Sequence, residues 1–405
     1  MTFRVAISGL NAAQSELAVT ANNIANSSTT GFKGSRVQFS ELFSASAQGG
    51  GAFEVGNGVR IAGVSQQFTQ GAINFTDNGL DMAISGKGFF TLGGGGARSY
   101  TRSGSFTVDR DGYVVNASAQ RLQVFPPLAG GGYNTGTTSD LRLTSGESAP
   151  SATQRVEMTL NLPATGKPPV RSPFDATDPD TYNFSSAVTV YDSLGAAHTA
   201  TAYFTKTDAD NTWEQRLHID GEPVGTPQTL VYSNTGAIIA PEGGVATFAP
   251  YNPATGAAPI ELTYDFGSTT QYGAAFSVSA VDQDGFTTGR LIGVETGPDG
   301  VVQARFTNGR SVGLGQIAIA QFASDDGLRP LGDTTWGESL ASGPALLGAA
   351  GTGGLGAVQS GALEGSNVDV TQQLVNMITA QRNFQANAKM ISTADAISQT
   401  IINIR

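Results

Sequence analysis

The chain has 405 residues, with 22 basic and 33 acidic side chains, a net charge of −11 at pH 7 and 53 glycines. Charged residues make up only 14% of it, against a usual share of about 25%, and the acidic balance excludes nucleic acid as a partner. The absence of cysteine excludes disulfides and thiolate-bound zinc, and the lack of any run of about 20 apolar residues excludes insertion into a membrane.

Apolar residues in the first 24 positions recur with the spacing of a helix. Phe3, Ile7, Leu10, Leu17 and Ile24 follow one another at intervals of three, four or seven residues, and no proline interrupts them. This spacing predicts a helix of about 22 residues with a narrow, heptad-like apolar seam.

The middle of the chain has the signals of an all-β body. Residues 27–58 mix Ser, Thr and Gly with isolated aromatic residues, which predicts an extended connection rather than a packed element. Six prolines in residues 145–180 indicate a crossing between domains, and the Gly- and Ala-rich residues 343–361 indicate a flexible connection. Asp-Gly or Asn-Gly pairs, which are strong hairpin signals, begin at Asn57, Asn78, Asp111, Asp220, Asp284, Asp299, Asn308 and Asp326.

The C-terminal residues repeat the helical pattern of the N-terminus. Asn367 or Asp369 is the expected N-cap, because short polar side chains satisfy the first free N–H groups of a helix. The apolar seam that follows predicts a helix of about 35 residues. It consists of Leu374, Met377, Phe384, Ala388 and Ile391.

Candidate sites for chemistry are weak. The G-x-G-x-x-G sequence at 351–356 follows no predicted strand and is interpreted as a linker. The D-x-D-G sequences at 109–112 and 282–285 lack the glycine and glutamate of an EF-hand and are interpreted as hairpin turns. His198 and His218 lie on separate predicted strands without an acid–serine arrangement nearby, which favours structural roles. We therefore predict no enzymatic activity, no cofactor and no bound metal.

The two terminal seams have two interpretations. They can close the monomer as an internal coiled coil, or they can pack against copies of the chain. Each stripe is narrow and poor in charge, both helices join the body through flexible segments, and lone helices are marginally stable in water. These features favour assembly. The predicted interface consists of Phe3, Ile7, Leu10, Leu17, Ile24, Leu374, Met377, Phe384, Ala388 and Ile391.

Four blocks of sequence carry a family resemblance. They are residues 21–33, 84–90, 100–106, and 363–370 with 378–388. The first block contains the signature residues Asn22, Asn23, Asn26, Gly31, Phe32 and Lys33. Together the blocks resemble the flagellar rod and hook family of axial proteins over essentially the whole chain. Residues 188–206 are similar to an outer domain that hook members of the family have and rod members lack.

The resemblance implies a mainly β fold with terminal α-helices, built from two β-domains plus an inner coiled-coil domain formed by both chain ends. The implied ranges are 1–25 with 366–405 for the inner helical domain, 26–70 with 343–365 for an extended linker region, 71–145 with 284–342 for the first β-domain, and 146–283 for the outer inserted β-domain.

The resemblance also implies a function. It is that of a structural subunit that self-assembles, outside the cell, into a curved hollow helical tube. Such a tube acts as a universal joint between motor and filament and as a conduit for exported subunits. The implied partners are other copies of the chain, the distal rod, the hook cap, the hook–filament junction proteins and the flagellar type III export apparatus. Export by that route agrees with the absence of a cleavable secretory signal. A distal rod protein is the first alternative, and a secreted β-rich adhesin is the second.

A polar, uncharged stripe lies opposite much of the C-terminal seam. Two interpretations remain open: the lining of a wetted channel that holds exported chains weakly, or an ordinary solvated helix face. The stripe consists of Gln372, Asn376, Asn383 and Asn387.

Overall fold

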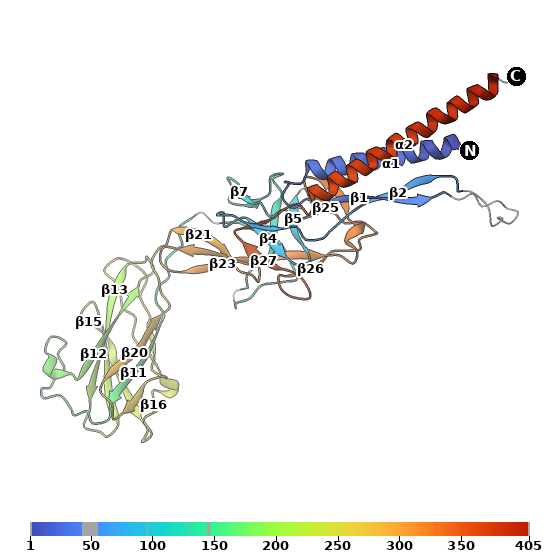
Figure 1. Cartoon of the computed structure of the whole chain (residues 1–405). Coiled ribbons are helices and arrows are strands. Elements are labelled where there is room, and N and C mark those ends of the chain that lie inside the picture. The colour runs from blue at the N-terminus through green and yellow to red at the C-terminus, as the bar shows by residue number, and fades with distance from the viewer. Residues whose placement is uncertain (1, 43–55, 95, 129, 144–145, 404–405) are drawn as a thin grey trace. The chain divides into compact units, whose positions relative to one another are not determined.

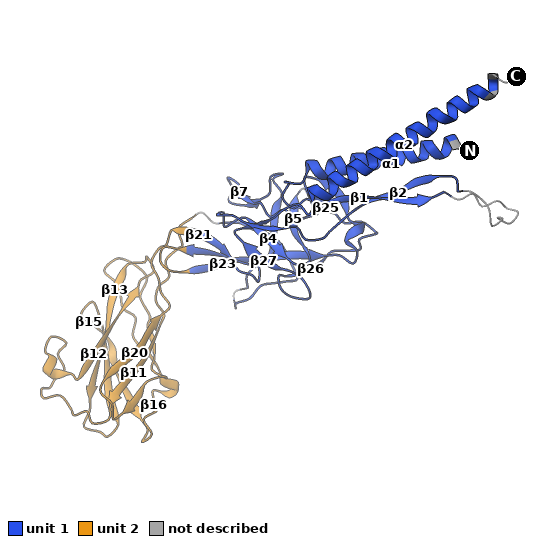
Figure 2. Cartoon of the chain, in the orientation of Figure 1, with its two compact units in different colours: residues 1–145, 293–305, 311–405 blue, residues 146–292, 306–310 orange. Residues whose placement is uncertain are grey.

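The computed structural model divides into two compact units (Figures 1 and 2). Unit 1 comprises residues 1–145, 293–305 and 311–405, and unit 2 comprises residues 146–292 and 306–310. Unit 2 thus continues beyond 283, where the predicted outer insert ends. The structure describes residues 2–42, 56–94, 96–128, 130–143 and 146–403.

Helices α1 (Thr2–Ala25) and α2 (Val370–Asn403) begin and end unit 1 and lie along one another (Figure 1). The prediction of a mainly β chain with a helix at each end is confirmed. Asp369 is the N-cap of α2, because its Oδ1 accepts the N–H groups of Thr371 at 2.8 Å and Gln372 at 3.3 Å.

Small residues form the contact between the two helices. Ala6, Ala13 and Thr20 are buried at seven-residue intervals on α1. They share the helix face on which Gly9 approaches α2 so closely that an added Cβ would lie 2.6 Å from Asn387 Oδ1. Ala380 is the corresponding fully buried residue of α2.

The predicted apolar seams are only partly covered in the single chain. Phe3 is 49% exposed, Ile7 38% and Leu374 47%. The other seam residues are half-buried, namely Leu10, Leu17, Ile24, Met377, Phe384, Ala388 and Ile391. Two helices cover only one strip of each other, and the closest approach falls where the side chains are smallest.

A β-hairpin lies beside α1 where the sequence predicted only extended chain. Strands β1 (Ser35–Glu41) and β2 (Val59–Gln66) pair antiparallel and contact the helix. That prediction is wrong for the described residues, because the pairing partner lies too far along the chain for a local pattern to reveal it. Residues 43–55 of the predicted linker region lie outside the described residues.

The rest of unit 1 is a β-body whose largest sheet has the strand order β21-β22-β23-β9-β5-β6-β25-β24. Two buried clusters fill it, one around Phe90, Phe106 and Ile317, the other aromatic around Tyr100 and Trp336. Its strands are β3 (Ile73–Phe75), β4 (Met82–Ser85), β5 (Phe89–Gly94), β6 (Ala97–Thr101), β7 (Thr107–Val108), β8 (Val114–Val115), β9 (Arg121–Phe125), β10 (Ser139–Asp140), β21 (Leu291–Thr296), β22 (Val301–Phe306), β23 (Ser311–Gln321), β24 (Arg329–Gly332), β25 (Thr335–Gly337), β26 (Leu346–Ala349), β27 (Ala357–Ser360) and β28 (Ala362–Glu364).

Short antiparallel pairs join the two arms of the chain that lead to the helices. Strand β27 pairs with β4 and β28 pairs with β3. Strand β26, earlier on the second arm, pairs with β23 of the β-body. The expectation of a flexible connection over 343–361 is therefore wrong. The glycines there permit close packing instead: a Cβ on Gly356 would lie 2.6 Å from the carbonyl oxygen of Ser85.

Unit 2 consists of two sheets that enclose one core. One sheet has the order β17-β18-β11-β19, with β20 on the other edge of β11, and the second has the order β12-β13-β14-β15-β16. The core between them includes Met158, Phe204, Trp213 and Tyr264. Its strands are β11 (Arg155–Pro163), β12 (Phe184–Tyr191), β13 (Ala197–Lys206), β14 (Thr212–Ile219), β15 (Glu222–Tyr232), β16 (Ile238–Ala240), β17 (Val245–Thr247), β18 (Thr263–Asp265), β19 (Thr270–Tyr272) and β20 (Ser277–Gln283).

Half of the hairpin signals mark turns between paired strands. The pairs at Asp111, Asp220, Asp299 and Asn308 join β7 to β8, β14 to β15, β21 to β22 and β22 to β23. Asn57 precedes β2, and its N–H bonds to the carbonyl of Leu42. The predictions at Asn78, Asp284 and Asp326 are wrong, because an Asx-Gly pair specifies a tight turn and not the strands it joins.

Candidate functional site: the linker clasp

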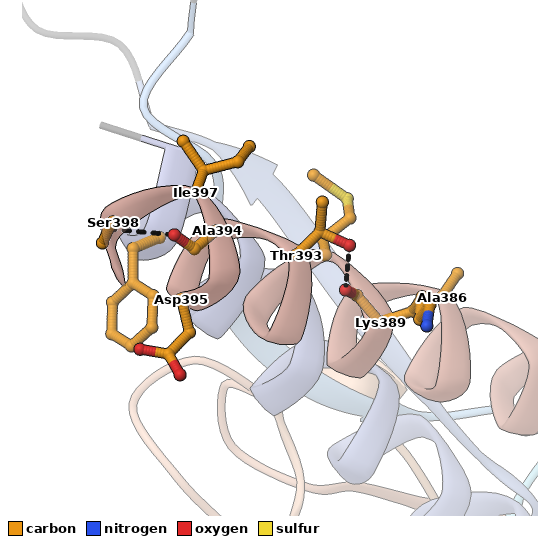
Figure 3. Close-up of a pocket in the computed structure, with 9 residues that line it drawn as sticks. Ala386, Lys389, Thr393, Ala394, Asp395, Ile397 and Ser398 are labelled. Carbon is orange, nitrogen blue, oxygen red and sulfur yellow. Dashed lines mark hydrogen bonds between the residues drawn. The ribbon is translucent and has the colours of Figure 1, made fainter. Parts of the chain in front are cut away.

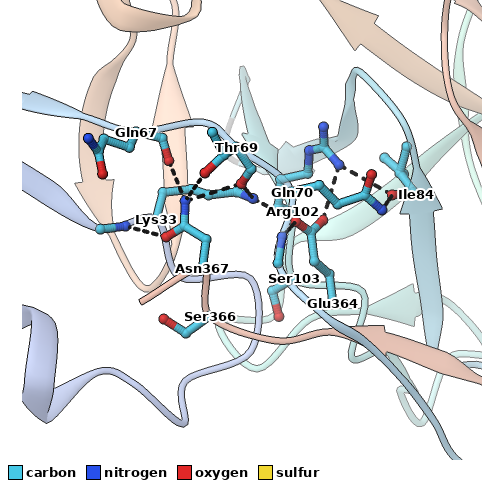
Figure 4. A network of polar contacts seen from close by, with 12 residues as sticks. Lys33, Gln67, Thr69, Gln70, Ile84, Arg102, Ser103, Glu364, Ser366 and Asn367 are labelled. Carbon is cyan, nitrogen blue, oxygen red and sulfur yellow. Dashed lines mark hydrogen bonds and ion pairs between the residues drawn. The ribbon is translucent and has the colours of Figure 1, made fainter. Parts of the chain in front are cut away.

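Glu364 is the centre of a buried polar network in unit 1, which we call the clasp (Figure 4). Its Oε1 lies 2.6 Å from Nζ of Lys33 and accepts the N–H of Gly71 at 2.9 Å. Its Oε2 lies 3.1 Å from Nη1 of Arg102. One carboxylate thus binds the segment after α1, the segment before β3 and the end of β6.

The chain after α1 is shaped to bring Lys33 to this point. Lys33 is buried and donates a second hydrogen bond to the carbonyl of Thr69 at 2.8 Å. Gly31 has φ +69°, and an added Cβ would lie 2.4 Å from the backbone nitrogen of Ser103. Its N–H bonds to the carbonyl of Glu364 at 2.8 Å. Only glycine fits both the backbone conformation and the close approach.

Arg102 supplies the second cation of the clasp from the β-body. Its Nη2 donates to the carbonyl of Gly86 at 2.7 Å and its Nη1 to that of Ile84 at 3.3 Å. Burial lowers the pKa of both Lys33 and Arg102, and the carboxylate of Glu364 acts in the opposite direction on each. Glu364 is therefore the main compensation for both cations, and Asp325 adds a smaller one for Arg102.

Asn367 adds a second tie beside the clasp (Figure 4). Its Oδ1 accepts the N–H of Gly34 at 2.8 Å, and its Nδ2 donates to the carbonyls of Gln67 at 2.6 Å and Thr69 at 3.1 Å. The sequence offered Asn367 as an N-cap of α2, but its side chain instead binds the arm that follows α1 to the arm that precedes α2.

Asn23 fastens the two helices to the hairpin. It is 2% exposed, its Nδ2 donates to the carbonyl of Ser35 at 2.8 Å, and its Oδ1 accepts the N–H of Ser35 at 2.9 Å. The same Nδ2 lies 3.3 Å from Oε1 of Gln373 on α2. This signature residue therefore joins α1, β1 and α2.

The remaining signature residues shape the end of α1. The carbonyl of Asn22 accepts the backbone N–H of Asn26 at 3.1 Å and its side-chain Nδ2 at 3.0 Å. The side chain of Asn26 in turn accepts the hydroxyl of Thr29 at 3.1 Å, and the N–H of Phe32 bonds to the carbonyl of Thr29. These bonds close the turn that leads from the helix to the clasp.

The polar stripe of α2 is divided between the chain's own contacts and solvent. Asn387 is half-buried against Gly9 of α1. Gln372 and Asn376 line a groove of about 470 Å³ between α1, β1 and α2, and Asn376 is half-buried there. Asn383 and Gln372 are exposed. The four residues thus do not form one free face.

An apolar groove of about 820 Å³ lies along α2 near the start of α1 (Figure 3). Phe3, Met390 and Ile397 supply its large apolar side chains, and all three are about half exposed. Lys389 and Asp395 are its charged lining residues. Apolar side chains are left uncovered by the intrachain helix contact at this end of the pair.

The sequence did not single out Glu364 or Arg102. Both lie inside the blocks that carry the family resemblance, and that membership was the only available signal. Among the described residues, no group of three or more metal-ligating side chains is suited to a metal ion. No described helix has both the length and the apolar character needed to cross a membrane.

Family models match four successive parts of the chain. The models for the flagella basal body rod protein, the flagellar hook protein FlgE/F/G D1 domain, the flagellar basal body protein FlaE D2 domain and the flagellar basal body rod FlgEFG protein C-terminal match residues 3–33, 83–161, 161–286 and 359–404. They define an axial protein of the rod and hook class. Lys33, Arg102 and Glu364 each fall in a different one of these matched parts.

Relatives that match over their full length identify the family within this class. The flagellar hook protein FlgE of Salmonella typhimurium is 39% identical over 416 residues, with 100% of both chains covered. That of Escherichia coli K12 is 38% identical over 415 residues with the same coverage, and that of Borreliella burgdorferi is 32% identical with 98% of both chains covered. The chain belongs to the flagellar hook protein FlgE family.

A solved structure shares the fold. The crystal structure of Helicobacter pylori flagellar hook protein FlgE2 matches with a TM-score of 0.56 at 15% identity, over 72% of this chain and 100% of that one. The fold likeness and the full-length sequence relatives agree.

Proposed function

We propose that the chain is the structural subunit of a bacterial flagellar hook. Copies assemble outside the cell into a curved hollow helical tube that transmits motor torque to the filament and conducts exported subunits. Membership of the hook protein family over the full length supports this over the distal rod and adhesin alternatives. The family is structural, and we propose no enzymatic activity.

The observation that carries the proposal is the apolar surface left on the helix pair. Helix α2 has 34 residues and α1 has 24, so about 15 Å of α2 extends beyond a full-length pairing. Ile378, Met390 and Ile397 are each about half exposed on α2, as Phe3 is on α1. Burial of such side chains between copies is the driving force that the geometry offers.

The clasp gives the subunit a mechanical link between this assembly surface and its β-body. A torque applied through the helices reaches the β-body along two chain arms. Glu364 and Asn367 on the arm before α2 bind the arm after α1, through charged hydrogen bonds to the carboxylate and through the side-chain amide. Charge-assisted bonds in a buried site are short and directional, so the arms resist twisting as one piece.

The remaining partners and roles follow from the family. We propose that the distal rod, the hook cap, the hook–filament junction proteins and the type III export apparatus meet this chain, and that the range 146–283 is the outer inserted domain. A channel-lining role is proposed for Gln372 and Asn383, the two residues of the polar stripe whose side chains are exposed.

The test is Leu374→Asp, with Val170→Asp as the matched control. Both positions are exposed apolar residues in the single chain, but Val170 lies in unit 2, outside both helices. Placing a carboxylate in an apolar contact between copies costs several kcal/mol, which raises the critical concentration for tube formation by at least about 100-fold. Electron microscopy and sedimentation of the purified chain measure this. Equal assembly of the two variants would contradict the proposal, provided that their monomers unfold alike.

A further inference from the structure

His198 lies between two carboxylates in unit 2. It stands on β13 and is 7% exposed. Its Nδ1 is 2.6 Å from Oδ2 of Asp220, and its Nε2 is 3.3 Å from Oδ2 of Asp192. A neutral imidazole carries one N–H, whereas both ring nitrogens of the imidazolium donate. The geometry therefore fits the protonated ring.

The two carboxylates hold neighbouring loops. The Asp192 side chain is fully buried, and its Oδ1 accepts the N–H groups of Leu194 at 2.9 Å and Ala196 at 2.8 Å. Its Oδ2 accepts the hydroxyl of Thr255 at 2.7 Å. Asp220, in the turn between β14 and β15, accepts the N–H of Thr199 at 2.9 Å.

Segment 251–260 depends on the first of these carboxylates. Its ends are fixed by a pair of backbone bonds between Tyr251 and Ile260. Between them, the side chain of Thr255 bonds to Asp192, and the N–H of Ala258 bonds to the hydroxyl of Ser193 at 2.9 Å. Both of these hydrogen bonds attach the segment to the turn at 192–195, of which Asp192 is the first residue.

The cluster lies where the chain enters and leaves unit 2. A Cβ on Gly195 would lie 2.8 Å from Pro150 and 3.4 Å from the backbone of Thr287. The N–H of Thr153 bonds to the carbonyl of Tyr191. The turn at 192–195 therefore packs against both connecting segments of the unit.

The ionisable groups facing His198 favour its proton. They are the carboxylates of Asp192 and Asp220 and the ring of Tyr251, 6.0 Å away, beside which Glu222 adds a further negative charge. Burial lowers the pKa of His198, but the hydrogen bonds to the two aspartates have a larger opposite effect. The pKa of His198 is therefore raised above its usual value.

We propose that a proton on His198 is a latch that closes this end of unit 2, and that its loss as pH rises frees segment 251–260. Without the imidazolium, the buried Asp192 carboxylate loses its counter-charge and is drawn toward water. Because the folded state binds the proton more tightly than the unfolded chain, the stabilisation is complete below about pH 6.5 and is lost as pH rises through the folded pKa. This inference concerns one unit and is independent of tube assembly.

The chain's two histidines provide the experiment and its control. His218 has no carboxylate partner among the described residues, and burial and then Arg216 lower its pKa. In the full-length monomer with labelled histidines, NMR should show one imidazole titrating above pH 6.5 and one below. His218→Gln assigns the two signals.

Hydrogen exchange then tests the latch. After correction for the intrinsic rate, protection of residues 252–259 should fall at least tenfold between pH 6 and pH 9, with the midpoint of the His198 titration. His198→Gln should give low, pH-independent protection, and His218→Gln should keep the wild-type transition. Asp220→Asn, which removes one charge with little change in shape, should move the midpoint to lower pH. Titration of His198 at or below pH 6.5, or an unchanged exchange profile in His198→Gln, would overturn the proposal.

Discussion

Replacement of Glu364 by glutamine tests the clasp directly. Glu364→Gln keeps the size of the side chain and removes its charge, so that Lys33 and Arg102 remain buried without the carboxylate that they share. The carboxamide also turns a donor toward groups that are themselves donors. Breaking a buried ion pair by removing one partner costs about 3–5 kcal/mol. Because two cations share this carboxylate, we expect a loss in the upper half of that range.

Tryptophan fluorescence can follow the unit concerned. The chain has two tryptophans, Trp336 in unit 1 and Trp213 in unit 2. In a Trp213→Phe background the remaining signal reports unit 1 alone. With a urea m value of about 2–3 kcal/mol/M, a loss of 4 kcal/mol lowers the midpoint by about 1–2 M. Glu41→Gln, at an exposed position of the hairpin, should change stability by no more than about 0.5 kcal/mol.

A second variant distinguishes the effect of the lost ion pair from a general disturbance of the structure around Glu364. Adding Lys33→Met to Glu364→Gln removes one of the stranded charges and should recover at least about 1 kcal/mol, which a double-mutant cycle measures. A Glu364→Gln loss below about 1 kcal/mol, or no recovery in the double variant, would refute the idea that this carboxylate holds the arms together.

Four further expectations can be checked separately. Gly31→Ala should lower the free energy of unfolding of unit 1 by at least about 1 kcal/mol in the same fluorescence assay, because a Cβ there meets the backbone at Ser103 in a positive-φ conformation. Limited proteolysis should trim both helices from the monomer but spare them in the tube, because the contact between α1 and α2 covers only one strip of each helix and leaves Phe3 and Leu374 exposed; equal protection would favour the closed monomer. A Gly-Ser linker in place of 146–283 should give tubes that are straight or irregular under electron microscopy, whereas unchanged curvature would assign curvature to unit 1. Burial raises the pKa of Asp192, but its hydrogen bonds outweigh this and hold it at about 2, so this carboxylate should contribute about 2 kcal/mol to the stability that unit 2 loses as pH falls from 5 to 2, and Asp192→Asn should remove that contribution in acid titrations followed by Trp213.

The sequence was sufficient to predict a structural feature wherever the physical rule behind that feature acts within a few residues. The three- and four-residue spacing of Phe3, Ile7 and Leu10 determined a helix, because side chains three or four apart share a helix face. Asp369 could be named as one of two candidate caps because the free N–H groups lie within three residues of it. The Asp220-Gly221 pair predicted a tight turn, because few residue types adopt the two positive φ angles that such a turn requires. The structure has both of these φ angles positive.

Which side of each helix is buried was decided only by the tertiary structure. The sequence indicated the large apolar residues, yet Ala6, Gly9 and Ala13 form the contact with α2. Apolar periodicity shows that one face of a helix will be buried, but it does not show which partner will bury it. Two helices approach each other most closely where their side chains are smallest. The large side chains keep part of their surface exposed, and we propose that contacts between copies bury it.

Neither the clasp nor the latch could be predicted from local sequence patterns, and the reason is the same for both. Lys33, Arg102 and Glu364 are far apart in the chain, and the rest of each arm gives no pattern that pairs them. Asp220 reaches His198 only because β13 and β14 pair in one register. A charge in a sequence has no fixed meaning until burial removes it from water and a partner compensates it, and both are properties of the folded chain.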